Sequence, residues 1–461
     1  MRILLVSHRS LPNHPAGTEV HTHQLAREFG RHGHDVAVFT AEKDPSRRHH
    51  SVHERRHDGV RYVELVNNLH LRSFEETYDS PAAEERFREF VRAFRPDVVH
   101  AAHLLNHSVG YAEVCERAGV PFTATLFDFW LMCPRFGQRR TPWGELCATI
   151  DLDRCVRCLA SLEYRATPLE RRVGGALARV RSATGLDLLP LAKRLRGRAE
   201  EGGAAPATGE GDATGFGPTR EQLERRAEVV RERLVPRVRA FVAPSRFLER
   251  EFETFGVEPA KLRFLRTGID TAPFAGFERT RDRVTRVTFV GTVVRHKGPH
   301  VLVEAFERMD PDLRGDLRLA VFGPGRHAPE YAADLERRVA ALGGEWGGAL
   351  DREDLPGVLA RTDVLVVPSL WYENAPLVIL EALATRTPFV VSDLGGMREL
   401  AEESGAGFVF PPGDADALSR RLTELSQDHA QLERASLAAP PVRTIADDAR
   451  DFLALLEEGL A

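Results

Sequence analysis

Two carboxylates, Glu373 and Glu381, lie eight residues apart in the segment PSLWYENAPLVILE, around the expected N-terminus of a helix. Pro376 suits the first position of that helix because its ring fixes φ. The preceding Asn374 and Ala375 would then leave backbone N–H groups directed at an anion. Glu381 would accept hydrogen bonds from ribose hydroxyls, and Glu373 would face a sugar. The alternative for Glu373 is that it only stabilises the positive helix end, by about 0.3–1 kcal/mol.

Two further strand-to-helix loops carry groups suited to a diphosphate. Gly17 precedes a helix in PAGTEVHTHQLAREF, and glycine lets backbone N–H groups approach a phosphate closely. In FVGTVVRHKGPH, Gly291 follows a strand, and Lys297, one of only four lysines in the chain, precedes a helix. Such a lysine reaches a diphosphate as a compact point charge, and Arg295 beside it could share that role. Each loop taken alone also fits an ordinary packing turn.

Two series of short apolar strands, alternating with amphipathic helices, must position these loops. The alternation predicts an α/β fold with two doubly wound parallel-sheet domains, each sheet covered on both faces. Open parallel sheets bind ligands at the carboxyl ends of their strands, so we expect the loops to meet in a cleft between the domains. The expected strands are residues 3–7, 35–40, 61–66, 97–102 and 121–127, followed by 284–292, 317–323, 363–369 and 388–393.

The same pattern predicts the domain boundaries. We expect a first domain over residues 1–268 with an insertion at about 130–238, and a second domain over 283–435. Residues 197–220 are rich in Gly, Ala, Pro and Glu and cannot bury enough apolar surface to order themselves, so a mobile loop between two Arg-rich helical arms is expected. An amphipathic helix within 440–461 is expected to dock back on the first domain.

Four of the five cysteines lie close together in CPRFGQRRTPWGELCATIDLDRCVRC, spaced x13, x7 and x2. Four thiols that end in C-x2-C are typical of a tetrahedral zinc site, which would brace the insertion. Disulfides are a second interpretation, which disagrees with a cytosolic chain, and reduced thiols without a ligand are a third. The DLD at 151–153 lies in the same loop and is not interpreted as a catalytic metal site. The cysteines are Cys133, Cys147, Cys155 and Cys158.

The composition is that of an ordinary globular protein, with 461 residues, 43% hydrophobic and 28% charged. A formal charge of −5 gives no general field for nucleic acid or membrane, although basic clusters act locally. No stretch of 18 apolar residues is present, and MRILLVS enters a strand without a signal-peptide region. These features predict a cytoplasmic protein. The Arg-rich arms fit solvated helix faces, with peripheral contact at the inner face of the membrane as the alternative.

The segment ENAPLVILE resembles the E-x7-E element of the retaining glycosyltransferases of family four, a nucleotide-sugar-dependent group with the GT-B fold. FVGTVVRHKG, APSRF, RTGID, SDLGGMREL and GFVFPPGD match other recurrent stretches of that family in the same order. PAGTEVHTHQLAREFGRHGHDV and DVVHAAH are looser matches in the first domain. The resemblance covers most of the chain outside residues 160–240. It implies an acceptor-side first domain with the cysteine-rich and helical insertion, facing a nucleotide-sugar-binding second domain across a cleft.

The resemblance also implies a role for each site residue. Glu373 would lie near the hydroxyls of the donor sugar, Glu381 on the ribose and Lys297 on the diphosphate. The family retains the anomeric configuration without an obvious protein nucleophile, because the departing phosphate oxygen takes the acceptor's proton on the same face. Lys and Arg side chains and helix dipoles neutralise the diphosphate, so no divalent metal is expected for catalysis. The anion site would be completed by amides near Pro376 and Leu377 and at Gly17.

The chain departs from the family at two positions. The family has Gly-Arg where this chain has Gly291 and Thr292, and threonine cannot supply the positive charge; Arg295 would have to reach the same phosphate. TLFDFW replaces the usual TLHDFW, so Phe127 stands where a histidine supports the reaction. We hypothesise that the enzyme remains active with altered donor geometry. The histidines that could approach from a neighbouring loop are His100, His103 and His107.

These features together predict a glycosyltransferase that moves a sugar from a nucleoside-diphosphate sugar to an acceptor hydroxyl with retention of configuration. The acceptor would be a carbohydrate, a lipid-linked sugar or a small molecule, in polysaccharide, glycolipid or other glycoconjugate synthesis, with no nucleic-acid partner. A catalytically impaired subunit that binds a nucleotide sugar is the main alternative. A nucleotide-sugar epimerase is a third hypothesis, which the E-x7-E element and the K-G loop disfavour.

Overall fold

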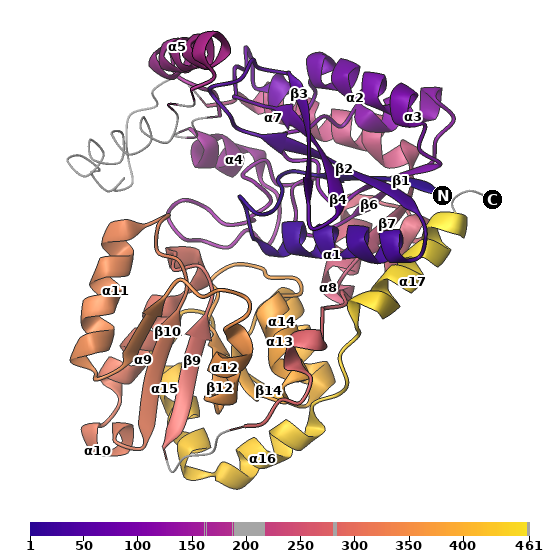
Figure 1. Ribbon diagram of the computed structural model, residues 1–461. Helices are drawn as coiled ribbons and strands as arrows, with labels where there is room; N and C mark the ends of the chain where they lie inside the picture. The colour runs from indigo at the N-terminus through magenta and orange to yellow at the C-terminus, as the bar shows by residue number, and fades with distance from the viewer. Residues whose placement is uncertain (161, 163, 187, 189–216, 280–283, 459–461) are drawn as a thin grey trace.

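Two β-sheets, one in each half of the chain, organise the protein (Figure 1). The computed structural model describes residues 1–160, 162, 164–186, 188, 217–279 and 284–458. The predicted α/β class with two doubly wound, mainly parallel sheets is confirmed. Most of the expected mobile loop at 197–220 lies outside the described residues.

The sheet of the first domain has eight strands, all paired in parallel except β3 with β4. In β1, Leu4 and Val6 pack into one hydrophobic core while Ile3 and Leu5 pack into another. Both faces of the sheet are therefore buried, which explains why this strand is a continuous apolar run. In spatial order the strands are β3 (Val52–His57), β4 (Val60–Val66), β2 (Asp35–Glu42), β1 (Arg2–Ser7), β5 (Val98–Ala101), β6 (Phe122–Thr125), β7 (Val238–Ala243) and β8 (Leu262–Phe264).

The sheet of the second domain has six strands, all parallel. The strand order reverses at β9, which pairs with β10 on one side and β12 on the other, as it reverses at β1 between β2 and β5 in the first sheet. Ligand sites of doubly wound proteins lie at such reversals, beyond the carboxyl ends of the strands. In spatial order the strands are β11 (Glu345–Gly348), β10 (Leu317–Phe322), β9 (Thr285–Val290), β12 (Val364–Val367), β13 (Phe389–Ser392) and β14 (Gly407–Phe410).

Helices cover both sheets and fill the connections (Figure 1). Those of the first domain are α1 (Gly17–Arg31), α2 (Pro81–Phe94), α3 (Tyr111–Arg117), α4 (Leu152–Leu159), α5 (Pro168–Thr184), α7 (Arg220–Val229) and α8 (Arg246–Phe255). The later helices are α9 (Pro299–Arg308), α10 (Pro311–Arg314), α11 (Pro329–Ala341), α12 (Leu355–Ala360), α13 (Leu377–Ala384), α14 (Gly395–Ser404), α15 (Ala415–Gln427), α16 (His429–Ala438) and α17 (Ile445–Glu458).

Several elements differ from the sequence-based expectations in their bounds or existence, and the expected strands did not include β7, β8, β11 or β14. The polar segment VHERRH forms β3, an edge strand that pairs with β4. Its side chains alternate between exposed and partly buried, so it lacks the apolar run by which the other strands were predicted. Helix α13 begins at Leu377, so Pro376 is its N-cap and not its first helical residue. The second Arg-rich arm was expected to be helical over roughly residues 221–238, but α7 ends at Val229 and a π-helical turn at Val230–Leu234 follows it directly.

The C-terminal helix α17 leaves the second domain and packs against α1 of the first (Figure 1). Phe452 and Leu456 of α17 share a core with Leu25 and Phe29 of α1. Its Asp448 is fully buried, accepts a hydrogen bond from the Gly268 backbone N–H at 2.9 Å and lies 2.7 Å from His21 Nε2. The last helix is therefore an integral part of the first domain's core.

The Phe452→Ala variant should lower the free energy of unfolding by about 3–5 kcal/mol, because it removes a buried ring and leaves a cavity between α17 and α1. Denaturant unfolding measures this loss. The control is Leu437→Ala on α16, whose side chain is 69% exposed and should cost less than about 0.5 kcal/mol. Equal stability of the two variants would show that α17 does not support the first domain.

Candidate functional site

Two of the predicted site residues, Glu373 and Lys297, form an ion pair at the carboxyl ends of β12 and β9. Lys297 Nζ lies 2.5 Å from Glu373 Oε1. The same oxygen accepts hydrogen bonds from Ser369 Oγ at 2.9 Å and from Trp371 Nε1 at 2.6 Å. Lys297 Nζ also lies 5.2 Å from the centre of the Trp371 ring, a cation–π distance. The structure thus joins two groups that stand 76 residues apart in the sequence.

Electrostatics keep Glu373 ionised although its side chain is buried. Burial alone would raise the pKa of Glu373, but the charge of Lys297 and the hydrogen bonds from Lys297, Trp371 and Ser369 outweigh it, so the pKa is lowered. Gly298 makes the close approach of the two loops feasible: its φ is +73°, and a Cβ there would lie 1.9 Å from the Pro368 carbonyl oxygen. The loops after β9 and β12 are therefore held together by both charge and backbone packing.

The N-termini of α1 and α13 face each other where the two domains meet. A Cβ added at Gly17 would lie 3.8 Å from the Leu377 side chain. The N-cap residues Ala16 and Pro376 offer no side-chain hydrogen bond to either helix. The first amides of both helices are thus uncapped by side chains, and each helix dipole adds positive potential at this point. This is the arrangement that an anion-binding site requires.

Glu381, predicted as a ribose ligand, is buried in α13 and forms an ion pair with Arg352. Arg352 Nη2 lies 3.0 Å from Glu381 Oε1. Burial raises the pKa of Glu381, and the nearby Arg352 charge only partly offsets this. Arg352 is 29 residues earlier in the chain and was not singled out from the sequence. Its guanidinium holds the carboxylate from one side.

The loop after β9 places Gly291, Thr292 and Arg295 around the same region. The Gly291 N–H donates to the Phe322 carbonyl at 3.0 Å, so this amide is used within the fold. The Arg295 guanidinium lies over the Tyr331 ring, 5.4 Å from its centre, and no ion pair involves it among the described residues. Tyr331 is in turn held by His300, whose Nδ1 lies 2.7 Å from the Tyr331 hydroxyl. The position of the Arg295 side chain is thus set by its contact with the Tyr331 ring.

Arg135 and Arg140, which sequence reasoning missed, bring positive charge from the cysteine-rich loop to this region. Burial lowers the pKa of Arg140, and the charges of Arg135 and Arg295 lower it further. Burial, followed by the Lys297 charge, lowers the pKa of His296 to about 4, and Arg140 and Arg135 add to the effect. Positively charged side chains of both domains therefore lie close together around His296. Because arginine is abundant throughout the chain, no sequence pattern distinguished Arg135 and Arg140 from the other arginines.

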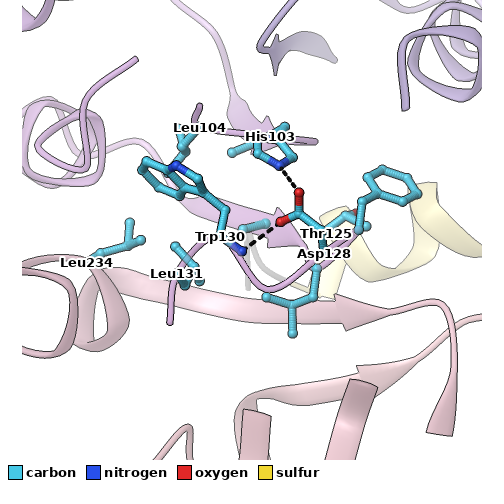
Figure 2. Close-up of a pocket in the computed structure, with 11 residues that line it drawn as sticks. His103, Leu104, Thr125, Asp128, Trp130, Leu131 and Leu234 are labelled. Carbon is cyan, nitrogen blue, oxygen red and sulfur yellow. Dashed lines mark hydrogen bonds and ion pairs between the residues drawn. The ribbon is translucent and has the colours of Figure 1, made fainter. Parts of the chain in front are cut away.

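His103 and Asp128 face each other in a pocket of the first domain (Figure 2). His103 Nε2 lies 2.9 Å from Asp128 Oδ2. Burial opposes the charged imidazole, but the charge and hydrogen bond of Asp128 outweigh it, so the pKa of His103 is raised. The His8 ring packs against His103 at 4.5 Å between centres, and His8 Nε2 lies 3.1 Å from Glu19 Oε1. A buried histidine with a raised pKa is thus held beside the loop after β6.

Of the three histidines that could replace a lost histidine at position 127, only His103 lines this pocket. His100 is buried between the hydroxyls of Thr123 and Thr125, each at 2.9 Å, and burial lowers its pKa to about 3. His107 is also buried, with Nε2 2.8 Å from the Ser7 carbonyl oxygen. His100 and His107 are held as core residues.

Phe127 and Asn374 connect the two domains beside the pocket. Asn374 Nδ2 donates to the Phe127 carbonyl oxygen at 2.6 Å. The Phe127 ring packs edge-on against His21, with 5.4 Å between ring centres. Asn374 Oδ1 is buried without a hydrogen-bond partner. The backbone of Phe127 therefore helps to place the segment that precedes α13, whatever its side chain contributes.

The four clustered cysteines line a single cavity. All are free thiols. Burial, and then the neighbouring thiols, raise the pKa of Cys155 to about 12. Among the residues that the structure describes, no three His, Cys, Asp or Glu side chains are spaced to hold a metal ion as they stand. Asp151 of the DLD caps α4 by accepting from the N–H groups of Asp153 and Arg154.

Comparisons with known proteins agree on the class of protein. The structure superposes on the sucrose-phosphate synthase of Thermosynechococcus elongatus with a TM-score of 0.63 at 17% identity, covering 99% of this chain and 98% of that one. It also matches Anabaena HepE in complex with UDP, with a TM-score of 0.61 at 15% identity, over 99% and 100% of the two chains. At this identity the likeness defines the fold, which is the GT-B fold of glycosyltransferases.

Family models and curated relatives narrow the class. Residues 15–181 match the family described as Glycosyltransferase Family 4, and residues 276–440 match Glycosyl transferases group 1. A segment of 221 residues is 31% identical to the glycogen synthase of Mycobacterium tuberculosis, covering 47% of this chain and 52% of that enzyme. The chain is therefore similar to glycosyltransferases in both domains, with the Glycosyltransferase Family 4 model matched in the first and the Glycosyl transferases group 1 model in the second.

A second curated relative differs in its reaction. A segment of 189 residues is 30% identical to the UDP-Gal:alpha-D-GlcNAc-diphosphoundecaprenol alpha-1,3-galactosyltransferase of Escherichia coli, covering 37% of this chain and 47% of that enzyme. The chain thus spans about half the length of the curated relatives it matches. No helix among the described residues is both long and apolar enough to cross a bilayer.

The Lys297→Met variant should be about 1–3 kcal/mol less stable at pH 7, because it leaves the buried carboxylate of Glu373 without its counter-charge. Adding Glu373→Gln to the same chain should recover part of the loss. The lowered folded-state pKa makes the pair stabilising above the ordinary glutamate pKa of 4.5, and this contribution is lost as the pH falls through the folded value. Denaturant unfolding at several pH values tests this; equal stability of wild type and Lys297→Met at pH 7 would contradict it.

Proposed function

We propose that the protein transfers a sugar from a nucleoside-diphosphate sugar to an acceptor hydroxyl, with retention of the anomeric configuration. The observation that carries the proposal is the meeting of two uncapped helix N-termini, at Gly17 and Leu377, beside the Lys297–Glu373 pair. Such a place suits a diphosphate next to a polyhydroxylated group. The structural neighbour that carries UDP supports a nucleotide as the anionic part of the ligand.

In the proposed reaction the bond between the anomeric carbon and the diphosphate oxygen breaks. The acceptor oxygen forms the new bond on the same face, and its proton passes to the departing phosphate oxygen. Lys297, Arg295 and the amides at Gly17 and Leu377 stabilise the charge that develops on the diphosphate, in the role that a divalent cation plays in other transferases. Glu373 orients the sugar through its hydroxyls.

The remaining donor contacts follow the geometry of α13. Glu381 would accept hydrogen bonds from the ribose while Arg352 holds its other side. Gly291 and Thr292 line the diphosphate by close backbone approach, and Asn374 and the backbone at Ala375 and Pro376 complete the contact at the helix end. The second domain, residues 283–435, would hold the donor, and the first domain, residues 1–268, the acceptor.

His103 is proposed to take over the role of the histidine that supports the reaction in the family, where this chain has Phe127. Its raised pKa keeps the imidazole protonated to higher pH, and Asp128 fixes its ring. Arg295 compensates for Thr292, and the charge of Arg140 lies close to that of Arg295. Polysaccharide, glycolipid or other glycoconjugate synthesis in the cytoplasm is the proposed setting, with the Arg-rich helix α5 at the inner membrane face for a lipid-linked acceptor.

One observation favours a second candidate function, a subunit that binds the donor without transferring the sugar. Phe127 and Thr292 remove a histidine and an arginine from the expected catalytic set, while the Lys297–Glu373 pair remains intact. Such a subunit would keep donor affinity and lose both transfer and slow donor hydrolysis.

Incubation with UDP-, GDP-, dTDP- and ADP-sugars should release a nucleoside diphosphate from one donor class. Glu373→Ala should lower that rate by at least about 100-fold, because the sugar loses its orienting carboxylate. The control is Glu402→Ala, an exposed carboxylate of the same domain. NMR of the product formed with an acceptor should show the donor's own anomeric configuration. Donor binding by calorimetry with no release, across a range of acceptors, would instead identify a binding subunit.

The double variant His103→Ala, Arg295→Ala should lose at least about tenfold in kcat/KM, because two positive charges near the leaving group are removed. Steady-state kinetics with the identified donor measure the loss. Arg337→Ala, which removes a 77% exposed arginine of α11, is the matched control. Turnover of the double variant equal to that of wild type would rule out the proposed compensation for Phe127 and Thr292.

A further inference from the structure

The connection between β6 and β7 brings four of the chain's five cysteines to the wall of one cavity. Cys155 and Cys158 lie one turn apart on α4. Cys133 closes a turn by donating its N–H to the Phe129 carbonyl at 2.7 Å, and the Cys147 N–H donates to the Arg139 carbonyl at 2.8 Å. The fifth cysteine, Cys115, is buried separately in α3.

Three arginines line the same cavity, each with an unused hydrogen-bond donor. The Nε atoms of Arg135, Arg140 and Arg154 are buried and have no hydrogen-bond partner in the structure. Buried N–H donors without acceptors are costly, and neutral thiols are weak acceptors. A metal-bound thiolate carries negative charge and accepts hydrogen bonds, and metal sites use such donors as their outer shell. The orphan donors therefore point to an anionic group that the four thiols would form.

We propose that Cys133, Cys147, Cys155 and Cys158 bind one structural Zn²⁺ as a tetrahedral tetrathiolate. Four thiols release four protons to solvent as the ion binds, and the resulting site carries a net charge of −2. The arginines of the cavity balance that charge. No three of the described ligand side chains are spaced to hold a metal as they stand, so each thiol would have to turn about its side-chain torsion toward a common centre to bind the ion at about 2.3 Å.

The proposed zinc site would brace the loop that supports the segment before α13. Arg139, held by the Cys147 carbonyl at 2.9 Å and by Glu251, lies over the Phe129 ring and over the Tyr372 ring, 5.3 Å from the centre of the latter. Tyr372 immediately precedes Glu373. The metal would therefore fix the cysteine-rich loop against the two domains at once, outside the transfer chemistry itself.

Metal analysis of the full-length protein, purified with a phosphine reductant and no chelator, should find about one zinc per chain. The Cys155→Ser, Cys158→Ser double variant should lose it, and Cys115→Ala should keep it. Zinc that persists in the double variant would place the ion on other ligands and overturn the proposal. No stoichiometric zinc in wild type, even after incubation with ZnCl₂, would do the same.

Two measurements on wild-type protein keep the test decisive if the cysteine variants do not fold. Replacement of zinc by Co²⁺ should give intense thiolate-to-cobalt charge-transfer absorption, together with the visible bands of a tetrahedral ion; their absence would overturn the assignment. Alkylation with iodoacetamide in denaturant and chelator, on protein purified without any reductant, should label all five cysteines. Four unlabelled cysteines would identify two disulfides in place of the metal site.

Discussion

The buried carboxylate of Glu373 is the group around which the loops of the second domain are arranged. A charge in this position is tolerated only with a counter-ion and several donors, which come from Lys297 after β9 and from the loop after β12. Those donors must converge on one oxygen, so the two loops cannot shift independently. Gly298 lets the backbone pass the Pro368 carbonyl closely enough for that convergence. The pair thus fixes the entrance to α13 before any ligand arrives.

The contact between the domains uses helix ends twice, in opposite ways. At α8 of the first domain, Glu399 of the second domain accepts hydrogen bonds from the N–H groups of Arg246 and Phe247 at 2.9 and 2.8 Å, so a protein carboxylate fills the helix end. At α1 and α13, near Gly17 and Leu377, no side chain caps the helix. The first arrangement holds the domains together through a carboxylate, whereas the second leaves the equivalent helix ends without a side-chain cap.

The sequence was sufficient to predict the fold because short apolar strands alternate with amphipathic helices in both halves of the chain. A doubly wound sheet built from such units has one reversal of strand order, and the two sheets have theirs at β1 and β9. Glu373 and Lys297 lie in loops that follow β12 and β9, as their local patterns predicted, and their roles stay predictions. Their direct pairing and the approach of Arg140 depend on contacts between distant segments, which no local pattern encodes. The same limit applies to the histidines: His100 and His103 differ by three positions, yet one is enclosed by strand hydroxyls and the other faces Asp128.

The replacement of an arginine by Thr292 changes where the positive charge of the site comes from. A residue next to Gly291 would carry its charge on the strand end itself, whereas Arg295 is held over Tyr331 and Arg140 comes from a loop of the other domain. Charge supplied across the domain contact depends on how that loop is folded and on how closely the domains approach. The architecture therefore couples the electrostatics around Lys297 and Arg295 to the position of the cysteine-rich loop.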